Sequence, residues 1–233
     1  MPLFYAPDIL TDNELPQEET QHCRRVLRLS QGDEICITDG KGFFYPAIID
    51  TLSGKRCKVV IKEAIRQEPF RKGYLHIAVA PAKNMERNEW FAEKATEIGI
   101  DEISFLNCLF SERKTIKLER INKIVVSAIK QSLKAYLPKV NEMATFKTFI
   151  AQSFEGQKFI AHCGEGEKPL LNGVIHKGEN VLILIGPEGD FSKDEIRKAM
   201  ENGFIPVSLG KSRLRTETAA MVACHTVNLA NHS

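Results

Sequence analysis

The sequence lacks the features that mark several large classes of protein. None of its six cysteines forms a CxxC pair, so neither a zinc site nor a thioredoxin-type redox site is indicated. No run approaches about 18 consecutive apolar residues, and no charged-then-apolar leader opens the chain. The glycine-rich segments lack the Gly-Lys-Ser/Thr of a Walker loop. We therefore expect a cytoplasmic protein that holds no metal and does not bind a membrane.

The charge is nearly balanced overall but unevenly distributed. The formal net charge of the 233 residues is +2. Residues 1–68 contain 9 Lys/Arg and 11 Asp/Glu, a net of −2, whereas residues 112–139 contain 8 and 2, a net of +6. This local excess suggests an anionic partner such as RNA, although a solvated helix face would explain it as well.

The first 68 residues have the pattern of a small β-domain. "EICITDG" (34–40) and "FFYPAIIDTL" (43–52) are β-rich runs joined by a hairpin-type turn, and "RCKVVIKEA" (56–64) follows a second turn. "QEETQHCRRVLRL" (17–29) has a helical pattern. We expect a small antiparallel barrel or sheet with one helix, followed by a polar linker. Small barrels often bind RNA, but a fold alone does not establish a function.

From Tyr74 onward, strand patterns alternate with helix patterns. Trp90, Phe91, Ala95 and Ile98 are expected on one side of the first helix, which stops at Gly99. The alternation predicts a mostly parallel sheet with helices on both faces, whose ligands bind beyond the carboxyl ends of the strands. Strands are expected at 74–80, 101–107, 158–163, 180–186 and 205–210, and helices at 84–99, 116–134, 192–203 and 216–230.

Two loops at that edge of the sheet combine glycines with polar residues. In "GPEGDFSKDEI" (186–196), two glycines permit unusual backbone dihedrals and close approach of a flat ligand, while Ser192 and Glu195 form a capping box. In "SLGKSRLRTETAAM" (208–221), polar residues lie at a helix start, where free N–H groups gather. A plain strand–turn–helix connection explains the first loop about as well. The second has more polar chemistry than a turn requires, and this favours a pocket for a polar ligand.

The segment "CGEG" (163–166) raises a rival interpretation, the glycine-rich turn of a Rossmann-type nucleotide or methyl-donor site. A complete fingerprint would open a long helix and lead to an acidic residue after the next strand. Here the following segment is short and is broken by Pro169. The fingerprint is incomplete, so this rival is disfavoured.

"LILIGPEGDFSKDEI" followed by "GFIPVSLGKSRLRTETAAMVA" resembles the signature of the RsmE family, the 16S ribosomal RNA (uracil-N3)-methyltransferases. "HCRRVLRLSQGDEI" is similar to the family's N-terminal RNA-binding domain, and "ERNEWFAEKATEIGIDEISFL" and "AIKQSLKAYLPKV" resemble its middle motifs. The resemblance covers nearly the whole chain. It implies a small PUA-like β-barrel at residues 1–68 and an α/β SPOUT methyltransferase domain at residues 69–233, with a mostly parallel, knotted sheet that ends in a C-terminal trefoil knot.

The resemblance also implies an activity, a cofactor and partners. The expected reaction is methylation of N3 of a specific uridine in the 16S ribosomal RNA of the small ribosomal subunit, with S-adenosyl-L-methionine as the methyl donor. The family's class builds each active site from two subunits, so a homodimer is expected. A non-catalytic RNA-binding or ribosome-assembly protein that kept the fold is the alternative, and it predicts no binding of S-adenosylmethionine.

Loops 161–163, 185–189 and 209–216 form the cofactor pocket by resemblance, with two leucines against the adenine. Methylation of uracil N3 requires loss of an imide proton, and hence a base or a cation that stabilises the uracil anion. Glu217 is the candidate base and Arg215 the candidate cation; alternatively, Glu217 caps the last helix and pairs with Arg215. The expected cofactor-binding residues are His162, Leu184, Ile185, Gly186, Pro187, Glu188, Gly189, Leu209, Gly210, Leu214, Arg215 and Thr216.

The long helix at 116–134 is expected to carry a cationic ridge opposite its apolar stripe, since no acid lies between Arg120 and Lys139. The stripe comprises Ile121, Ile124, Val125, Ala128 and Ile129. We expect the ridge and three arginines of the first domain to contact RNA phosphates. The residues are Arg120, Lys123, Lys130 and Lys134 of the ridge, and Arg24, Arg25 and Arg28.

The chain departs from the family pattern at a few positions. Asp190 stands where a second glycine is usual, which adds negative charge near the pocket. The "EQS.R" motif is "KQSLK" here, and lysine keeps the positive charge of arginine but lacks its bidentate fork. The usual N-terminal arginines are absent from "MPLFYAPDIL". These departures bear on RNA binding more than on methyl transfer.

Overall fold

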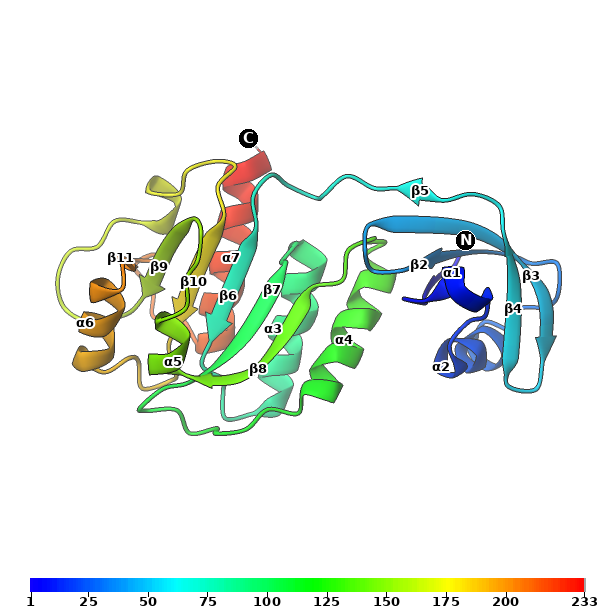
Figure 1. Ribbon diagram of the computed structural model, residues 1–233. Coiled ribbons are helices and arrows are strands. Elements are labelled where there is room, and N and C mark those ends of the chain that lie inside the picture. The colour runs from blue at the N-terminus through cyan, green and yellow to red at the C-terminus, as the bar shows by residue number, and fades with distance from the viewer. Residues whose placement is uncertain (233) are drawn as a thin grey trace. The chain divides into compact units, whose positions relative to one another are not determined.

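The computed structural model describes residues 1–232, which form two compact units (Figure 1). The first comprises Met1–Pro69 and Val126–Leu137, and the second comprises Phe70–Val125 and the chain from Pro138 on. Within the described residues, no helix has the length and apolar character needed to cross a bilayer.

The first unit is built on a five-stranded, mostly antiparallel sheet. Its strands are β1 (Leu3–Tyr5), β2 (Glu34–Thr38), β3 (Phe43–Ser53) and β4 (Arg56–Ile61) in that order, with β5 (Ile65–Arg66) paired to β3. The predicted hairpin is confirmed by the antiparallel pairing of β2 and β3. β1 pairs with β2 in parallel and was not predicted, because three residues are too few to show a period.

Three short helical segments complete the first unit: α1 (Ile9–Asp12), α2 (Gln17–Gln21) and a π-helix, η1 (His22–Val26). The last two replace the single helix expected at 17–29. Alternate residues of β2 and β3 point into one core with β1, and Phe4, Ile35, Ile37 and Ile49 are fully buried there.

The first unit also takes in residues 126–137, which the predicted division at residue 68 did not anticipate. The reason is a set of backbone hydrogen bonds to the β2–β3 hairpin. Gly42 N donates to Ala135 O at 3.0 Å, and Leu137 N donates to Gly40 O at 2.9 Å. Pairing of this kind joins segments far apart in the sequence, so a linear reading of composition does not reveal it.

The second unit is an α/β structure with a six-stranded sheet that is parallel throughout, as predicted. The strand order is β11 (Ile205–Val207), β9 (Gln157–Ala161), β10 (Val181–Ile185), β6 (Leu75–Val79), β7 (Glu102–Asn107) and β8 (Lys139–Thr145). β8 was not predicted. Its sequence, KVNEMAT, is polar and none of its residues is fully buried, so it lacks the apolar pattern of the other strands.

Helices cover both faces of this sheet. On one face, Ala78, Leu182 and Leu184 share a core with α5 (Phe146–Ile150) and α6 (Lys193–Glu201). On the other, α7 (Thr216–His232) packs against β6, β10 and α3 (Met85–Ile98). A short 3-10 helix, η2 (Leu171–Gly173), also contacts α7. Every residue of β6 and β10 is therefore buried.

Helix boundaries follow the capping signals in the sequence. The side chain of Asn84 caps α3, which ends at Gly99 with φ of 125°, and the predicted Ser192–Glu195 capping box opens α6. Trp90 was expected on the buried side of α3 but is 39% exposed. The buried stripe contains Asn88, Phe91, Ala92 and Ala95, and Trp90 lies outside that 3–4 spacing. The predicted stripe of α4 (Leu118–Gln131) is buried at Ile121, Val125, Ala128 and Ile129.

A buried polar network joins the N-terminal halves of β6, β7 and β8. His76 is 7% exposed, and its Nε2 lies 2.8 Å from Ser104 Oγ. Its Nδ1 lies 3.7 Å from Glu102 Oε2, and Asn141 donates to both Glu102 and Ser104. Burial lowers the pKa of His76 to about 4, and this outweighs the attraction of Glu102.

Folding stability is therefore expected to depend on His76 between about pH 6.5 and pH 4. The unfolded histidine binds a proton near pH 6.5 and the folded one does not, so lowering the pH favours the unfolded chain, with a loss of up to about 3 kcal/mol. The experiment compares urea unfolding at pH 7 and pH 4.5 for wild type, His76→Gln and His176→Gln. The exposed-histidine control should keep the wild-type loss and His76→Gln should show a smaller one. An equal loss in all three proteins would contradict this prediction.

Candidate functional site

Three predicted cofactor loops begin at one edge of the parallel sheet. Ala161, the last residue of β9, is paired with Ile185 at the end of β10 and with Val207 at the end of β11. We call residues 162–170 the first loop, 186–192 the second loop and 208–215 the third loop. The strand arrows of β6 and β9 point toward the same edge in Figure 1. The structure therefore brings the three predicted loops to one edge of the sheet, and each of them follows a different strand.

The first and second loops are tied together by Asp190. Its Oδ2 accepts a hydrogen bond from Cys163 N at 2.8 Å, and its Oδ1 accepts one from Phe191 N at 2.8 Å. Asp190 has φ of 64°, in the left-handed region that aspartate tolerates better than most residues. Glycine, the residue that the resemblance leads us to expect here, adopts this conformation freely. The added carboxylate binds main-chain N–H groups of the two loops.

The second loop is also tied to α7 and to the loop after β6. The hydroxyl of Thr216, a residue that is 5% exposed, donates to Gly186 O at 3.1 Å. Glu188 Oε1 accepts from Lys83 N at 3.0 Å. These contacts fix the second loop from both sides, and they give Thr216 and Glu188 positioning roles that the sequence did not specify.

The glycines act differently from the expectation. Among the glycines of the second and third loops, the left-handed conformation belongs to Gly210, with φ of 127°, and not to Gly186 or Gly189. A Cβ atom on Gly186 would lie 3.1 Å from the Phe191 ring, and one on Gly189 would lie 3.1 Å from Phe110 Cβ. A Cβ atom on Gly210 would meet no atom within 4 Å. Close packing therefore constrains Gly186 and Gly189, whereas Gly210 faces open space.

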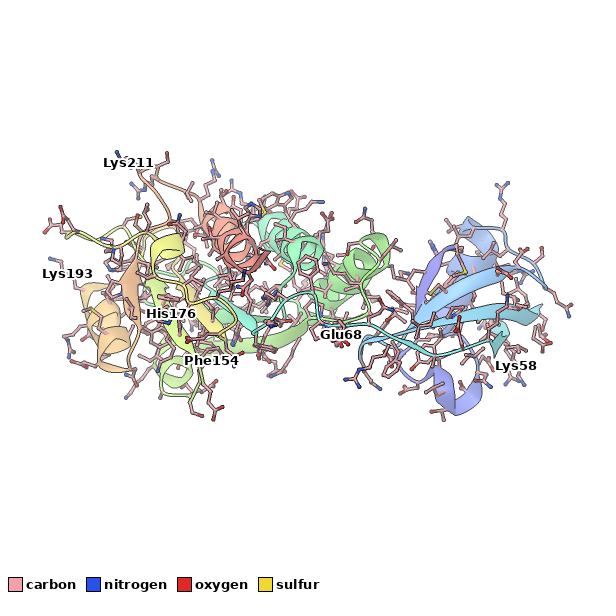
Figure 2. All side chains as sticks on the ribbon, turned by 90° about the horizontal axis from the view of Figure 1, so that it is seen from above. Lys58, Glu68, Phe154, His176, Lys193 and Lys211 are labelled. Carbon is pink, nitrogen blue, oxygen red and sulfur yellow. The ribbon has the colours of Figure 1, made fainter. Side chains whose placement is uncertain are left out.

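The other predicted cofactor residues fall into two groups. Leu184, Ile185 and Pro187 are buried, so their side chains belong to the interior beneath the second loop. Leu209, Leu214 and His162 are partly exposed. His162 Nδ1 accepts from Gly164 N at 3.1 Å, and burial, aided by Lys168, lowers the pKa of this histidine. The side chains of Lys211, in the third loop, and of Lys193, at the start of α6, point away from the body of the second unit (Figure 2).

Glu217 lies in the first turn of α7, where a carboxylate is favoured by the helix dipole. Its side chain is 11% exposed, and its Oε1 lies 3.7 Å from Nε of Arg87 on α3. Arg215, the partner expected from the sequence, is exposed. Arg87 was missed because its approach to Glu217 depends on the packing of α3 against α7. In the sequence, Arg87 is marked only by its place in the segment 86–106, which resembles a middle motif of the family.

The predicted RNA-binding cations are more engaged than expected. Arg120 pairs with Glu89 of α3 at 2.5 Å, Lys123 pairs with Glu119 at 3.2 Å, and Lys130 pairs with Glu19 of α2 at 2.6 Å. Lys130 is only 19% exposed, so it belongs to the interior of the first unit and not to an open ridge. The absence of acids between Arg120 and Lys139 was misleading, because Glu119 of the same helix and acids from α2 and α3 reach these cations.

In the first unit, Arg24, Arg25 and Arg28 are exposed, and Arg24 donates to Gly54 O at 3.1 Å. Arg28 also has a positive φ of 55°. Lys134 is partly buried. All three predicted first-unit arginines are therefore exposed, and Arg24 makes a hydrogen bond within the unit.

A cavity lies beside the third loop and the end of the first loop. It has a volume of about 440 Å³ and is bounded by Ser208–Gly210, by residues 170–172, and by the second half of α7. Leu209 and Gly210 thus line this cavity together with Leu170 at the end of the first loop, whereas the second loop does not line it. Residues 170–172 reach this place because Leu171 N bonds to Ser208 O at 3.0 Å. Among residues 1–232, no three His, Cys, Asp or Glu side chains lie together in a group that could hold a metal ion.

Comparison with known proteins places this fold in a family. The RNA methyltransferase domain family matches residues 69–228, and the RNA methyltransferase PUA domain family matches residues 15–62. A probable rRNA-methyltransferase from Porphyromonas gingivalis is 44% identical, with a TM-score of 0.95 over 100% of this chain and 99% of the other.

Two further relatives carry a more specific name. A ribosomal RNA small subunit methyltransferase E from Neisseria gonorrhoeae, bound to S-adenosyl methionine, is 27% identical, with a TM-score of 0.86 over 96% of this chain and 95% of the other. The enzyme of the same name from Synechocystis is 29% identical and covers 97% of this chain and 76% of its own. The chain belongs to the RsmE family of ribosomal RNA small subunit methyltransferases.

Proposed function

We propose that this protein is an S-adenosylmethionine-dependent enzyme that methylates N3 of a uridine in 16S ribosomal RNA. The observation that carries the proposal is the junction of the three loops beside Glu217, at the carboxyl edge of a parallel sheet. A ligand site at this edge is the rule for such sheets. The relative from Neisseria gonorrhoeae has S-adenosyl methionine bound, which supports this choice of cofactor.

The three loops suit that cofactor. Gly210 presents bare main chain to open space, and Leu209 and Leu214 are partly exposed apolar side chains of the same loop. Gly186 and Gly189 contribute main-chain groups held in place by Thr216 and Glu188. Apolar walls with a few fixed polar groups are what an adenosyl ligand requires. When bound, S-adenosylmethionine supplies an electrophilic methyl group on a sulfonium ion.

Glu217 is proposed to accept the N3 proton of the uracil. The neighbouring Arg87, 3.7 Å from Glu217 Oε1, fixes the direction of the carboxylate. The exposed Arg215 lies two residues earlier and is free of the α7 core, so it suits the uracil anion. Orientation and proton removal are the two contributions that an enzyme must make when its cofactor already carries a reactive methyl group.

The finer features implied by the family are part of the proposal. The second unit is proposed to contain a trefoil knot, which the insertion of β10 between β9 and β6 supports. The first unit is proposed to be a PUA-like barrel that binds RNA, supported by the PUA domain match and by the exposed Arg25 and Arg28. Because the substrate is ribosomal RNA, we place the reaction in the cytoplasm.

A homodimer is also proposed, with the second half of α7 at the contact. Leu229 is 61% exposed and Leu170 is 52% exposed, and both border the 440 Å³ cavity. A second copy that covers this apolar surface would remove it from water.

Leu229→Glu should therefore yield monomers in light scattering, because a carboxylate would be buried at the contact without a partner. Met200→Glu is the matched control, since Met200 is an exposed apolar residue of α6 outside this surface. The control should remain a dimer. A wild-type protein that is monomeric and fully active would contradict the proposal.

The experiment that tests the function combines binding with turnover. Calorimetry with S-adenosylmethionine should show a single class of site, and purified protein should transfer labelled methyl groups to small ribosomal subunits or to free 16S RNA. The non-catalytic alternative predicts neither heat nor label. Nucleoside analysis of the labelled RNA should identify N3-methyluridine, and label in any other nucleoside would refute the proposed position.

A further inference from the structure

The loop after β7 contains a tight, well-anchored turn over Cys108–Ser111. Ser111 N donates to Cys108 O at 3.2 Å, and Cys108 N donates to Ser111 Oγ at 3.0 Å. Leu109 N donates at 2.9 Å to Glu195 Oε1, from the buried capping residue of α6. Cys108 and Ser111 are themselves buried. The turn is therefore held in place from both ends and from a neighbouring helix.

This turn nevertheless directs its two central side chains toward water. Leu109 is 66% exposed and Phe110 is 50% exposed. Phe110 also lies against the second loop, since its Cβ is 3.1 Å from the position of a Cβ on Gly189. A rigid turn that presents an aromatic side chain beside the bare main chain of a proposed cofactor loop suits binding better than packing.

The charges around the turn favour an anionic partner. Arg113 donates through Nε and Nη2 to Lys83 O, and through Nε to Ala82 O at 3.2 Å. Lys114 Nζ donates to Asn107 Oδ1 at 3.1 Å and Cys108 O at 3.4 Å. Both cations are thus held by neutral oxygens, which fix their positions without cancelling their charge. Glu112, the acid of the same segment, is paired with Lys83 at 2.8 Å.

We propose that Phe110 stacks on an unpaired base of the substrate RNA, while Arg113 and Lys114 contact the adjoining phosphates. Aromatic side chains next to fixed cations are the usual means of holding single-stranded nucleic acid. A second copy of the chain would cover the apolar pair as well, but it would not account for two uncancelled cations. The inference rests on the proposed function, because it assumes that the site acts on RNA.

Phe110→Ala should raise KM for the RNA and the dissociation constant of the RNA complex by about tenfold to hundredfold, the range typical of one lost base stack. Affinity for S-adenosylmethionine should stay within about twofold. Phe110→Tyr should retain wild-type RNA binding, while Phe110→Leu, which keeps the apolar surface, should behave like the alanine variant. Met200→Ala serves as a control for loss of an exposed apolar side chain elsewhere.

A spectroscopic measurement tests stacking directly. Trp90 is the single tryptophan, so Phe110→Trp in a Trp90→Phe background places one fluorophore on the turn. RNA binding should quench it, whereas S-adenosylmethionine alone should not.

If wild type methylates RNA but Phe110→Ala matches wild type, or if Phe110→Leu matches Phe110→Tyr, the stacking inference is wrong and the proposed function stands. If Phe110→Ala changes dimerisation and not RNA binding, the turn is a contact between copies, and the inference is again overturned. Loss of methylation in wild type would instead refute the proposed function.

Discussion

Glu217→Gln is expected to lower turnover by about 10²–10⁴-fold, the usual loss when a general base is removed. Glutamine keeps the shape of the side chain and its place in the first turn of α7. Cofactor affinity should therefore survive, because the three loops do not depend on this carboxylate. The measurement is single-turnover methyl transfer to small ribosomal subunits, with calorimetric titration of S-adenosylmethionine alongside.

Arg87→Gln is the matched control because it breaks the same ion pair from the other side. If the pair only holds α3 against α7, both variants should lose stability and activity to similar extents. If Glu217 removes the proton, Arg87→Gln should retain far more turnover than Glu217→Gln. Near-normal turnover in Glu217→Gln would return this residue to a capping role and make Arg215 the principal candidate.

Gly210→Val is expected to weaken binding of S-adenosylmethionine by about 100-fold or more. Valine disfavours the φ of 127°, and its side chain would fill the open space beside the third loop. A loss of about 2–3 kcal/mol from these two effects corresponds to that factor. Calorimetry on the folded variant measures it.

Gly32→Val provides the control for backbone strain. Gly32 also has a positive φ, 93°, and a Cβ atom there would also meet nothing within 4 Å, but it lies in the first unit. Both variants should lose some stability to urea, and only Gly210→Val should lose cofactor affinity. Equal affinities in the two variants would show that the third loop does not bind the cofactor.

The sequence predicted the second unit well because its signals are local. Buried strands read as apolar runs, and the capping residues Asn84 and Ser192 mark where helices begin. The parallel sheet followed from alternation alone. Elements without local signals were missed. The polar β8 and the three-residue β1 exist because neighbouring strands offer hydrogen-bond partners, and a single sequence does not display such partners.

The sequence predicted which loops form the candidate site, but not which residues contact one another there. Motifs placed Gly186, Gly210 and Glu217 near one edge, yet the partners of these residues come from elsewhere in the chain. Arg87 reaches Glu217 from α3, and Glu19 engages Lys130 from α2. A charge that looks available along one helix can be neutralised by an acid far away in the sequence. A strand can therefore be predicted from its own sequence, whereas the availability of a cation can be judged only when its tertiary contacts are known.

The most direct test of the central claim is a map of N3-methyluridine in 16S ribosomal RNA from three strains. One strain carries the wild-type gene, one lacks it, and one carries Glu217→Gln in its place. Mass spectrometry of RNA fragments should find one N3-methyluridine in the wild type, none in the deletion strain, and none or a trace in the Glu217→Gln strain. An unchanged N3-methyluridine in the deletion strain would contradict the assigned activity.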